Sequence, residues 1–501
     1  MTALTRTAVT GRGAHRRTTL PVLVLALCFA TVPSAAAGGS VALTGAAVAL
    51  SAVAATVVAV RLRLSLVELT VIALPVHFYP PGRGSLVNLS LADAVLALLL
   101  LAAVVPVWRR GGAGGRGGGP APDVARPTWP LLLGYALALQ LVLWASLVGP
   151  VLDGGADFLG GVVAAAKIAL ACGYLLLLYA AAAPRLRAGE HRVLDVWAAT
   201  ATASALIGVG ASALYAVGVD LGLSYFWRAS GTFEDPNAFS VYLLLSLGVV
   251  IAAHRLRTGR PWSWNVVVIV VAVLLSGSRA ALAAMALAAV ATVLLTLGTR
   301  AGVAFRRLAA VTALLGVLAV LVLPDQWVGD VLQRATSVFT PDDGAAPDAR
   351  FELWSVAVQQ WASSPVLGVG AGQYIPVAQQ MLGPQMNTVP HNTYLGFLAQ
   401  TGTVGLLVFL LVPALVVVRT LRAARAGDAG APYLLFSVLC LLVQAFTLSL
   451  ENARPMWAVL GLVLAMYDPA APGPEEPHHP ATPHRRGLPH SSPARRGLRW
   501  S

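Results

Sequence analysis

The stretch TVPHNTYL, residues 388–395, marks the turning point of this sequence. A long polar loop, 325–392, ends there, and an apolar segment long enough to cross a bilayer, 393–418, begins. His391 therefore lies where water meets hydrocarbon. A histidine can accept a proton at neutral pH, so this boundary is a candidate place for chemistry at a membrane surface.

Apolar segments like the one after His391 recur along the whole chain. The 501 residues are 57% hydrophobic and 11% charged, whereas charged residues make up about a quarter of a soluble domain. The sequence therefore predicts an all-α, polytopic membrane fold with about 14 transmembrane helices, within roughly 12–14. The segments are 20–37, 41–60, 64–79, 89–108, 129–149, 158–182, 193–219, 237–253, 263–277, 279–298, 307–324, 393–418, 431–449 and 455–468.

The net charge of +13 is distributed unevenly across these segments. If the N-terminus is inside and the segments alternate, the inside connectors and the two tails hold 27 of the 34 basic residues. This asymmetry follows the positive-inside rule, so the basicity indicates topology rather than nucleic-acid binding. Both termini are predicted to be cytoplasmic, and the loop 325–392 is predicted to lie outside.

Composition also divides the chain into regions. The tails are rich in Pro, His, Arg and Ser and lack periodicity, which is typical of disorder. The first apolar segment fits an uncleaved helix or a cleaved signal peptide. The predicted regions are a basic tail (1–19), N-terminal transmembrane helices (20–220), a core that includes the outer loop (221–418), C-terminal transmembrane helices (419–469) and a second tail (470–501).

One part of the outer loop has helical periodicity. Asp348 is a plausible N-cap, Pro365 ends the run, and four large apolar residues between them fall within a sector of roughly 80°. These are Phe351, Trp354, Val358 and Trp361. The pattern predicts a helix whose aromatic face packs on the bundle, or lies on the membrane with Arg350 at headgroup level; both can hold together.

Two arginines on the predicted outer side are candidate anion ligands. Arg279 stands at the outer end of an apolar segment, and Arg350 stands in the loop. A guanidinium binds a phosphate through two parallel hydrogen bonds and keeps its charge. The alternatives are a snorkelling side chain for Arg279, a solvated loop charge for Arg350 and a purely structural histidine at position 391.

Four further patterns have a structural reading beside a functional one. Asp235 and Asn237 in the loop 230–237 fit a helix cap. The glycines of 368–372 resemble a phosphate loop, but no buried strand precedes them, so a nucleotide site is discounted. Lys167 lies inside an apolar segment, where an ion pair or a relay would involve Glu68 or Asp93. The acidic residues Asp342, Asp343 and Asp348 lack clustered His or Cys, so no metal site is expected.

An ordered set of motifs gives the sequence a family resemblance. They are GTFEDPN (231–237), SGSR (276–279), RFELW (350–354) continuing through PVLGVG (365–370), and HNTYL (391–395) with GTVG (402–405). In this order, with a large outer loop between the second and the last, they resemble the O-antigen ligase/polymerase family of polytopic bacterial glycosyltransferases. The resemblance covers roughly residues 225–415.

The resemblance implies a membrane glycosyltransferase of the bacterial cytoplasmic membrane with an extracytoplasmic active site. It would transfer or polymerise a glycan from a polyprenyl-diphosphate carrier onto an acceptor hydroxyl, with inversion and without a metal or cofactor. His391, Arg279 and Arg350 would be catalytic, and the two arginines, Asn392, Tyr394 and Asn237 would bind substrate.

The implied partners are the lipid-linked donor and a glycan or lipid acceptor; proteins of polysaccharide export or assembly are further candidates. Nucleic acid is not expected. A ligase and a polymerase are both compatible with these motifs. A transporter or flippase of lipid-linked saccharides is the alternative, although the sequence lacks the internal repeat expected of one.

Overall fold

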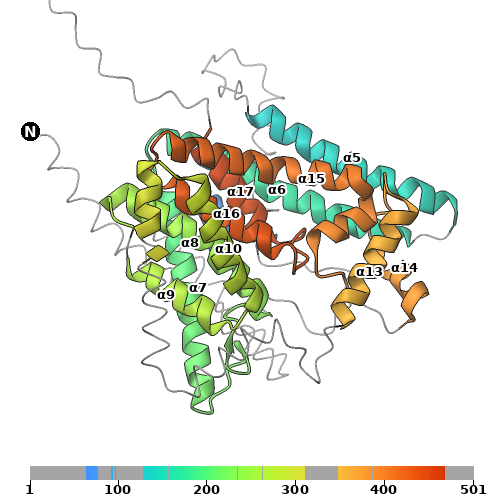
Figure 1. Ribbon diagram of the computed structural model, residues 1–501, viewed down its shortest axis with the longest axis horizontal. Coiled ribbons are helices and arrows are strands. Elements are labelled where there is room, and N and C mark those ends of the chain that lie inside the picture. Colours follow the sequence, from blue (N-terminus) through green and yellow to red (C-terminus); the bar gives the residue numbers. More distant parts are fainter. Residues whose placement is uncertain are drawn as a thin grey trace, which may run out of the picture.

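The computed structural model of the chain describes residues 64–76, 92–93, 96, 128–154, 157–233, 235–261, 263–307, 309–310, 348–384 and 388–468. These residues are mostly helical (Figure 1). The helices are α3 (Leu66–Ala73), α5 (Thr128–Leu152), α6 (Phe158–Arg187), α7 (Arg192–Ala216), α8 (Pro236–Thr258), α9 (Trp264–Leu275), α10 (Arg279–Leu295), α13 (Asp348–Ser363), α14 (Tyr374–Leu382), α15 (Thr393–Arg425), α16 (Ala431–Gln444) and α17 (Arg454–Met466). A short hairpin pairs β1 (Ser224–Tyr225) with β2 (Arg228–Ala229).

The long helices agree with the predicted membrane fold. Within the described residues, α5, α6, α7, α8 and α15 are long and apolar enough to cross a bilayer, and α9, α10, α16 and α17 are shorter apolar helices. Each of these coincides with a segment expected from hydropathy. The helical membrane character is therefore confirmed, whereas a total of fourteen spans is not. The segments 20–37, 41–60, 89–108 and 307–324 fall wholly or largely outside the described residues.

One expected span is much shorter than predicted. The described part of segment 64–79 forms only α3, whose eight residues rise about 12 Å, far less than the hydrocarbon thickness. The helix starts at a capping box between Ser65 and Glu68. It stops at Leu74 because Pro75 has no N–H to continue the hydrogen-bond ladder.

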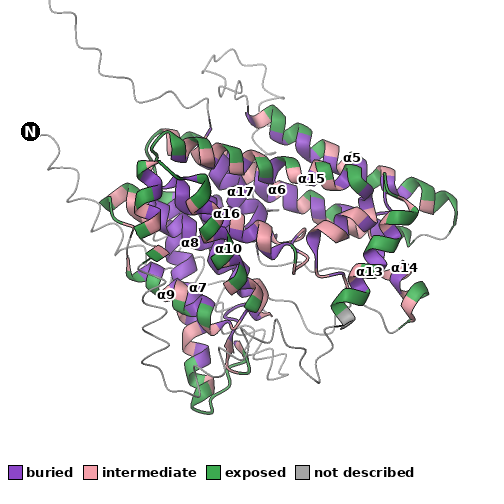
Figure 2. Ribbon diagram, viewed as in Figure 1, coloured by how far each residue is buried: buried purple, intermediate pink, exposed green. Residues whose placement is uncertain are grey.

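The bundle is packed so that its two ends differ in charge. α16 contacts α8, α10 and α15, and α17 packs along α6. Figure 2 shows α8 buried over most of its length and α5 with long exposed stretches. The last turns of α6, α8 and α15 carry arginine pairs, whereas the sequence motifs lie at the beginnings of α8, α10 and α15. The motifs and the basic turns therefore stand at opposite ends of these helices.

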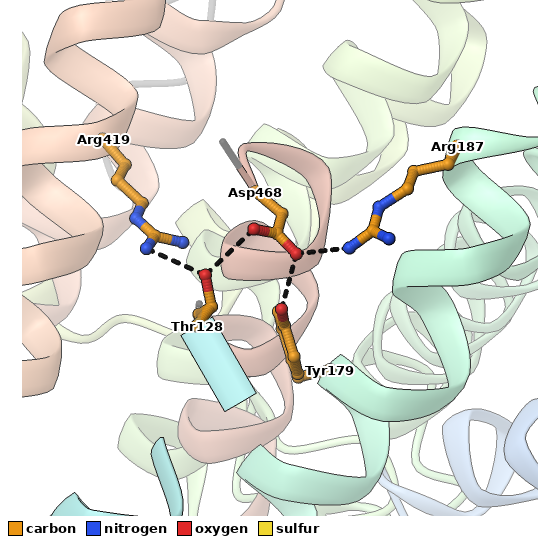
Figure 3. A network of polar contacts seen from close by, with 5 residues as sticks. All are labelled: Thr128, Tyr179, Arg187, Arg419 and Asp468. Carbon is orange, nitrogen blue, oxygen red and sulfur yellow. Dashed lines mark hydrogen bonds and ion pairs between the residues drawn. The ribbon is translucent and has the colours of Figure 1, made fainter. Parts of the chain in front are cut away.

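A polar network closes the basic end of the bundle (Figure 3). The carboxylate of Asp468 accepts hydrogen bonds from the Tyr179 hydroxyl at 2.5 Å and the Thr128 hydroxyl at 2.9 Å, and it pairs with Arg187. Arg419 donates to the Thr128 hydroxyl at 3.0 Å. These contacts tie the ends of α5, α6 and α15 to the residues that follow α17.

The glycine-rich segment 368–372 is a packing element. Helix α15 is broken at Gly402, whose φ is +66°. The N–H groups of Val369 and Gly370 donate to the carbonyls of Ala399 and Gln400, at 2.8 and 3.1 Å, beside this break. A Cβ on Gly368 would lie 2.4 Å from the Gln400 backbone, so only glycine permits this approach.

Helix α13 begins at Asp348, as predicted, but it buries a different face. Leu353, Val356 and Ala357 are buried in a small core with residues of α14 and α15, whereas the Phe351 side chain is 66% exposed and that of Val358 44% exposed. The prediction that the aromatic face packs on the bundle is wrong for these two residues. The membrane-surface interpretation of the exposed face stays a prediction.

Candidate functional site

His391 lies in the turn that leads into α15. Its side chain is half-buried, and its φ of +47° is the left-handed conformation that few residues other than glycine adopt. The ring Nε2 lies 3.2 Å from the Thr388 hydroxyl oxygen. The preceding carbonyl, of Pro390, accepts a hydrogen bond from Trp354 of α13 at 2.9 Å. Helix α13 therefore holds the turn that presents the imidazole.

The surroundings of His391 favour the neutral imidazole. Burial lowers the pKa of His391 below its usual value, the positive charge of Arg350 lowers it further, and the carboxylate of Asp235 opposes both. A neutral ring can accept a proton, which fits the expected role of a base. The same electrostatic coupling brings Arg350, on the first turn of α13, and Asp235, the N-cap of α8, into the neighbourhood of His391.

A chain of hydrogen bonds links the beginning of α8 to the end of α9. Asp235 caps α8 through the Ala238 N–H and accepts from the Asn237 amide at 3.0 Å. The side-chain Oδ1 of Asn237 accepts from Arg228 Nη2 at 3.3 Å, and Arg228 donates through Nε to the backbone carbonyl of Ser276 at 2.8 Å. The motifs 231–237 and 276–279 are thus joined by Arg228.

Arg279 joins the site at this turn. It is the first residue of α10, it is exposed, and the Ser278 side chain caps the helix beside it. Gly277 has φ +58°, and a Cβ there would lie 3.0 Å from the Trp227 ring. The glycine lets the hairpin approach the turn closely. Arg279, Arg350 and His391 therefore stand at the same end of the bundle.

Two of the expected substrate-binding residues also support the fold. Asn392 is buried and caps α15 by accepting from the Leu395 N–H at 3.0 Å. The Tyr394 hydroxyl donates to the carbonyl of Leu442 on α16 at 2.7 Å. Their role in binding substrate stays a prediction.

Arg228 is the residue that sequence reasoning missed. It was recognisable only as one of a few arginines on the predicted outer side, a few residues before the motif 231–237. Its task depends on the β1–β2 hairpin, which turns it toward Ser276, and no sequence period shows that contact.

The expected partners of Lys167 are engaged elsewhere. Glu68 pairs with Arg192 at 3.1 Å, and Asp93 pairs with Arg454 at 2.8 Å. The charge of Lys167 acts instead on Glu451, in the connector between α16 and α17. Both expected partners of Lys167 are therefore paired with arginines.

The described part of the chain brings no three His, Cys, Asp or Glu side chains together in a way that could hold a metal ion. Asp342 and Asp343 lie outside it. The named charges of the site are three guanidinium groups (Arg228, Arg279 and Arg350) and the carboxylate of Asp235. This arrangement suits an anionic ligand next to a proton acceptor.

Comparison with known proteins finds a family similarity over part of this site. Residues 264–410 match the sequence model of the family described as O-antigen ligase. The matched range includes Arg279, Arg350 and His391, whereas Asp235 and Asn237 precede it. No curated protein matches the chain. Over residues 264–410, less than a third of the chain, the sequence is thus similar to the O-antigen ligase family.

Proposed function

We propose that this protein transfers a glycan from a polyprenyl-diphosphate carrier to an acceptor hydroxyl at the outer face of the bacterial cytoplasmic membrane. The family supports glycan transfer of the O-antigen ligase type. The observation that carries the proposal is the position of a half-buried His391 at the helix ends that also present the exposed Arg279 and Arg350.

In this proposal, Arg279 and Arg350 bind the diphosphate of the donor. The donor carries a diphosphate that gains negative charge as the glycosidic bond to it breaks. Arg279 and Arg350 are exposed at the motif-bearing end, so both guanidinium groups can reach a diphosphate at the membrane surface. Fixed positive charge beside a leaving group stabilises the transition state more than the ground state.

In this proposal, His391 is the base for the acceptor hydroxyl. Its depressed pKa keeps the ring neutral, so it can accept the proton of the attacking hydroxyl. The hydroxyl oxygen bonds to the anomeric carbon, the bond from that carbon to the diphosphate oxygen breaks, and the proton remains on His391. Attack opposite the leaving group inverts the anomeric configuration. The donor bond is already activated, so neither ATP nor a metal is required.

The test is transfer by the purified full-length protein in nanodiscs, given lipid-diphosphate-linked glycan from its own host. Wild type is expected to form a new glycosidic bond in the presence of EDTA, and His391→Ala, Arg279→Ala and Arg350→Ala are expected to lose it. Arg300→Ala is the matched control, because Arg300 is also exposed but follows the far end of α10. Full turnover in all three site variants would overturn the proposal.

The products also separate the remaining alternatives. A ladder of lengthening glycans indicates a polymerase, and one addition per acceptor indicates a ligase. Movement of the intact donor across vesicles with no new bond would identify a transporter instead.

A further inference from the structure

A second polar site lies beside the candidate active site, inside the bundle. A cavity of about 60 Å³ opens between α5, α6, the outer part of α15 and the connector from α16 to α17. Leu143, Ile168 and Phe397 form apolar walls. The polar lining residues are Gln400, Thr401, Glu451 and Asn452. Its volume has room for roughly four water-sized groups.

The cavity begins close to His391. Gly396, one of its lining residues, donates its N–H to the carbonyl of Asn392 in the first turn of α15. One helical turn therefore separates the cavity from the residue that follows His391. The cavity lining thus includes the first turn of the helix that follows His391.

The connector that carries the polar groups is fixed in place. The Leu450 N–H donates to the Thr393 hydroxyl at 2.8 Å, and the Trp457 ring N–H donates to the Glu451 carbonyl at 2.9 Å. The backbone on both sides of Glu451 is thus tied to α15 and α17, so its side chain and that of Asn452 stand at defined positions in the cavity wall.

Two hydrogen-bond acceptors in this wall have no partner. Glu451 Oε2 and Asn452 Oδ1 are both shielded from solvent, and neither has a hydrogen-bond partner among the described residues. A buried acceptor without a donor destabilises the fold, so such an atom marks a place for a ligand or water. Both atoms require a donor, such as a hydroxyl group.

The charges around the cavity cancel. Lys167 on α6 acts on Glu451, and its charge also interacts with Arg454, which is paired with Asp93. Of these four side chains, two are basic and two are acidic. This balance favours a neutral ligand, in contrast to the surplus of arginine at the neighbouring site, which favours an anion.

We propose that this cavity is a saccharide subsite that binds the hydroxyl-bearing edge of one neutral sugar ring of the substrate. Sugar hydroxyls donate to Glu451 Oε2 and Asn452 Oδ1, and the apolar face of the ring lies against Phe397. The inference rests on the proposed function and adds to it the place where a sugar is held while His391 acts on a hydroxyl.

The probe is the host's own repeat-unit oligosaccharide, released from its lipid carrier by mild acid and labelled with a fluorophore. Its binding to the full-length protein in nanodiscs is compared for wild type, Asn452→Leu and Ala164→Leu. The second variant fills the cavity without touching the polar groups, because Ala164 lines it. The matched control is Ala166→Leu, on the exposed side of the same helix. Both cavity variants are expected to weaken binding at least about tenfold, and the control to leave it unchanged.

A second probe separates this inference from the proposed function. Polyprenyl diphosphate without sugar is expected to bind the cavity variants as tightly as wild type, and to bind Arg350→Ala more weakly. Oligosaccharide binding that persists in both cavity variants, or that is absent from wild type, overturns the subsite but leaves the diphosphate result standing. Adding the lipid-linked donor identifies the source of the sugar: displacement assigns the subsite to the donor glycan, and simultaneous binding assigns it to the acceptor.

Discussion

The two ends of the bundle use the same kinds of side chain in opposite ways. At the basic end, the buried Asp468 accepts from a threonine, a tyrosine and an arginine that come from two other helices. At the other end, Arg279 and Arg350 are exposed, and His391 is only half-buried. The closed network fixes helix positions, whereas the open set keeps charge accessible to a ligand. The difference teaches that accessibility, more than residue type, separates a structural arginine from a candidate catalytic one.

The largest expected effect is at His391. His391→Asn keeps a polar side chain that tolerates the left-handed backbone, but the amide cannot accept the proton. We expect transfer to fall by about 10²–10⁴-fold while thermal stability in detergent stays that of wild type. Turnover is measured with the lipid-linked donor, and unfolding by intrinsic tryptophan fluorescence. A lower unfolding temperature for His391→Asn would mean that the end with His391 also stabilises the fold.

Asp468 is expected to behave in the opposite way. Asp468→Ala leaves Arg187 and the Tyr179 hydroxyl without their acceptor, and breaking a buried pair costs about 3–5 kcal/mol; the partial exposure of Arg187 puts the value toward the lower limit. We expect a lower unfolding temperature and unchanged turnover per folded molecule. The control is Asp220→Ala, which removes an exposed carboxylate. Equal stability of the two variants would contradict the structural role of the network.

Arg350→Lys sharpens the comparison on the open side. Lysine keeps the charge but loses the two parallel hydrogen bonds that a guanidinium makes to a phosphate. We expect turnover to fall about tenfold, because one strong hydrogen bond to the phosphate is lost. The unfolding temperature should not change. For Arg187→Lys, at the end closed by Asp468, we expect the opposite: a lower unfolding temperature and unchanged turnover per folded molecule. The two pairs of measurements, made side by side, test whether geometry matters to chemistry at one end and to stability at the other.

The pH profile gives the smallest effect. Because the pKa of His391 lies below its usual value, the base stays neutral to lower pH, and the acid limb of kcat/KM should fall below about pH 6.5. The lowered pKa of His391 also affects the free energy of unfolding. Its contribution to stability is fully present above the pKa of histidine in the unfolded chain, and it is lost as the pH falls through the pKa of His391 in the folded protein. The titration of His391 itself, followed by NMR, should move to higher pH in Arg350→Ala and to lower pH in Asp235→Asn. Shifts in the same direction would contradict the arrangement of charges.

The sequence predicted the parts of the fold that depend on local patterns. Hydropathy located α5 to α10 and α15 to α17, and a cap at Asp348 located α13. The buried face of α13 was mispredicted because two adjacent faces are both apolar, and the choice depends on α14 and α15. Periodicity identifies residues that share a face, but it does not show what that face meets.

For the candidate site, the sequence motifs predicted three residues that the structure brings to one end of the bundle. Ordered motifs singled out His391, Arg279 and Arg350, and the family match covers all of them. The contact from Arg228 to Ser276 and the pair of Asp93 with Arg454 join residues far apart in sequence. Such contacts depend on the packing of whole helices, so no short motif encodes them.

The left-handed backbone at His391 has a consequence for the genetics of this protein. Glycine is the replacement that would relax the turn, yet a histidine codon needs more than one base change to become a glycine codon. Asparagine and aspartate, which also tolerate this conformation, are each one base change away. Spontaneous null alleles at this codon that still yield folded protein are therefore expected to be enriched in these two residues, whereas proline or leucine alleles should also reduce the amount of protein in the membrane.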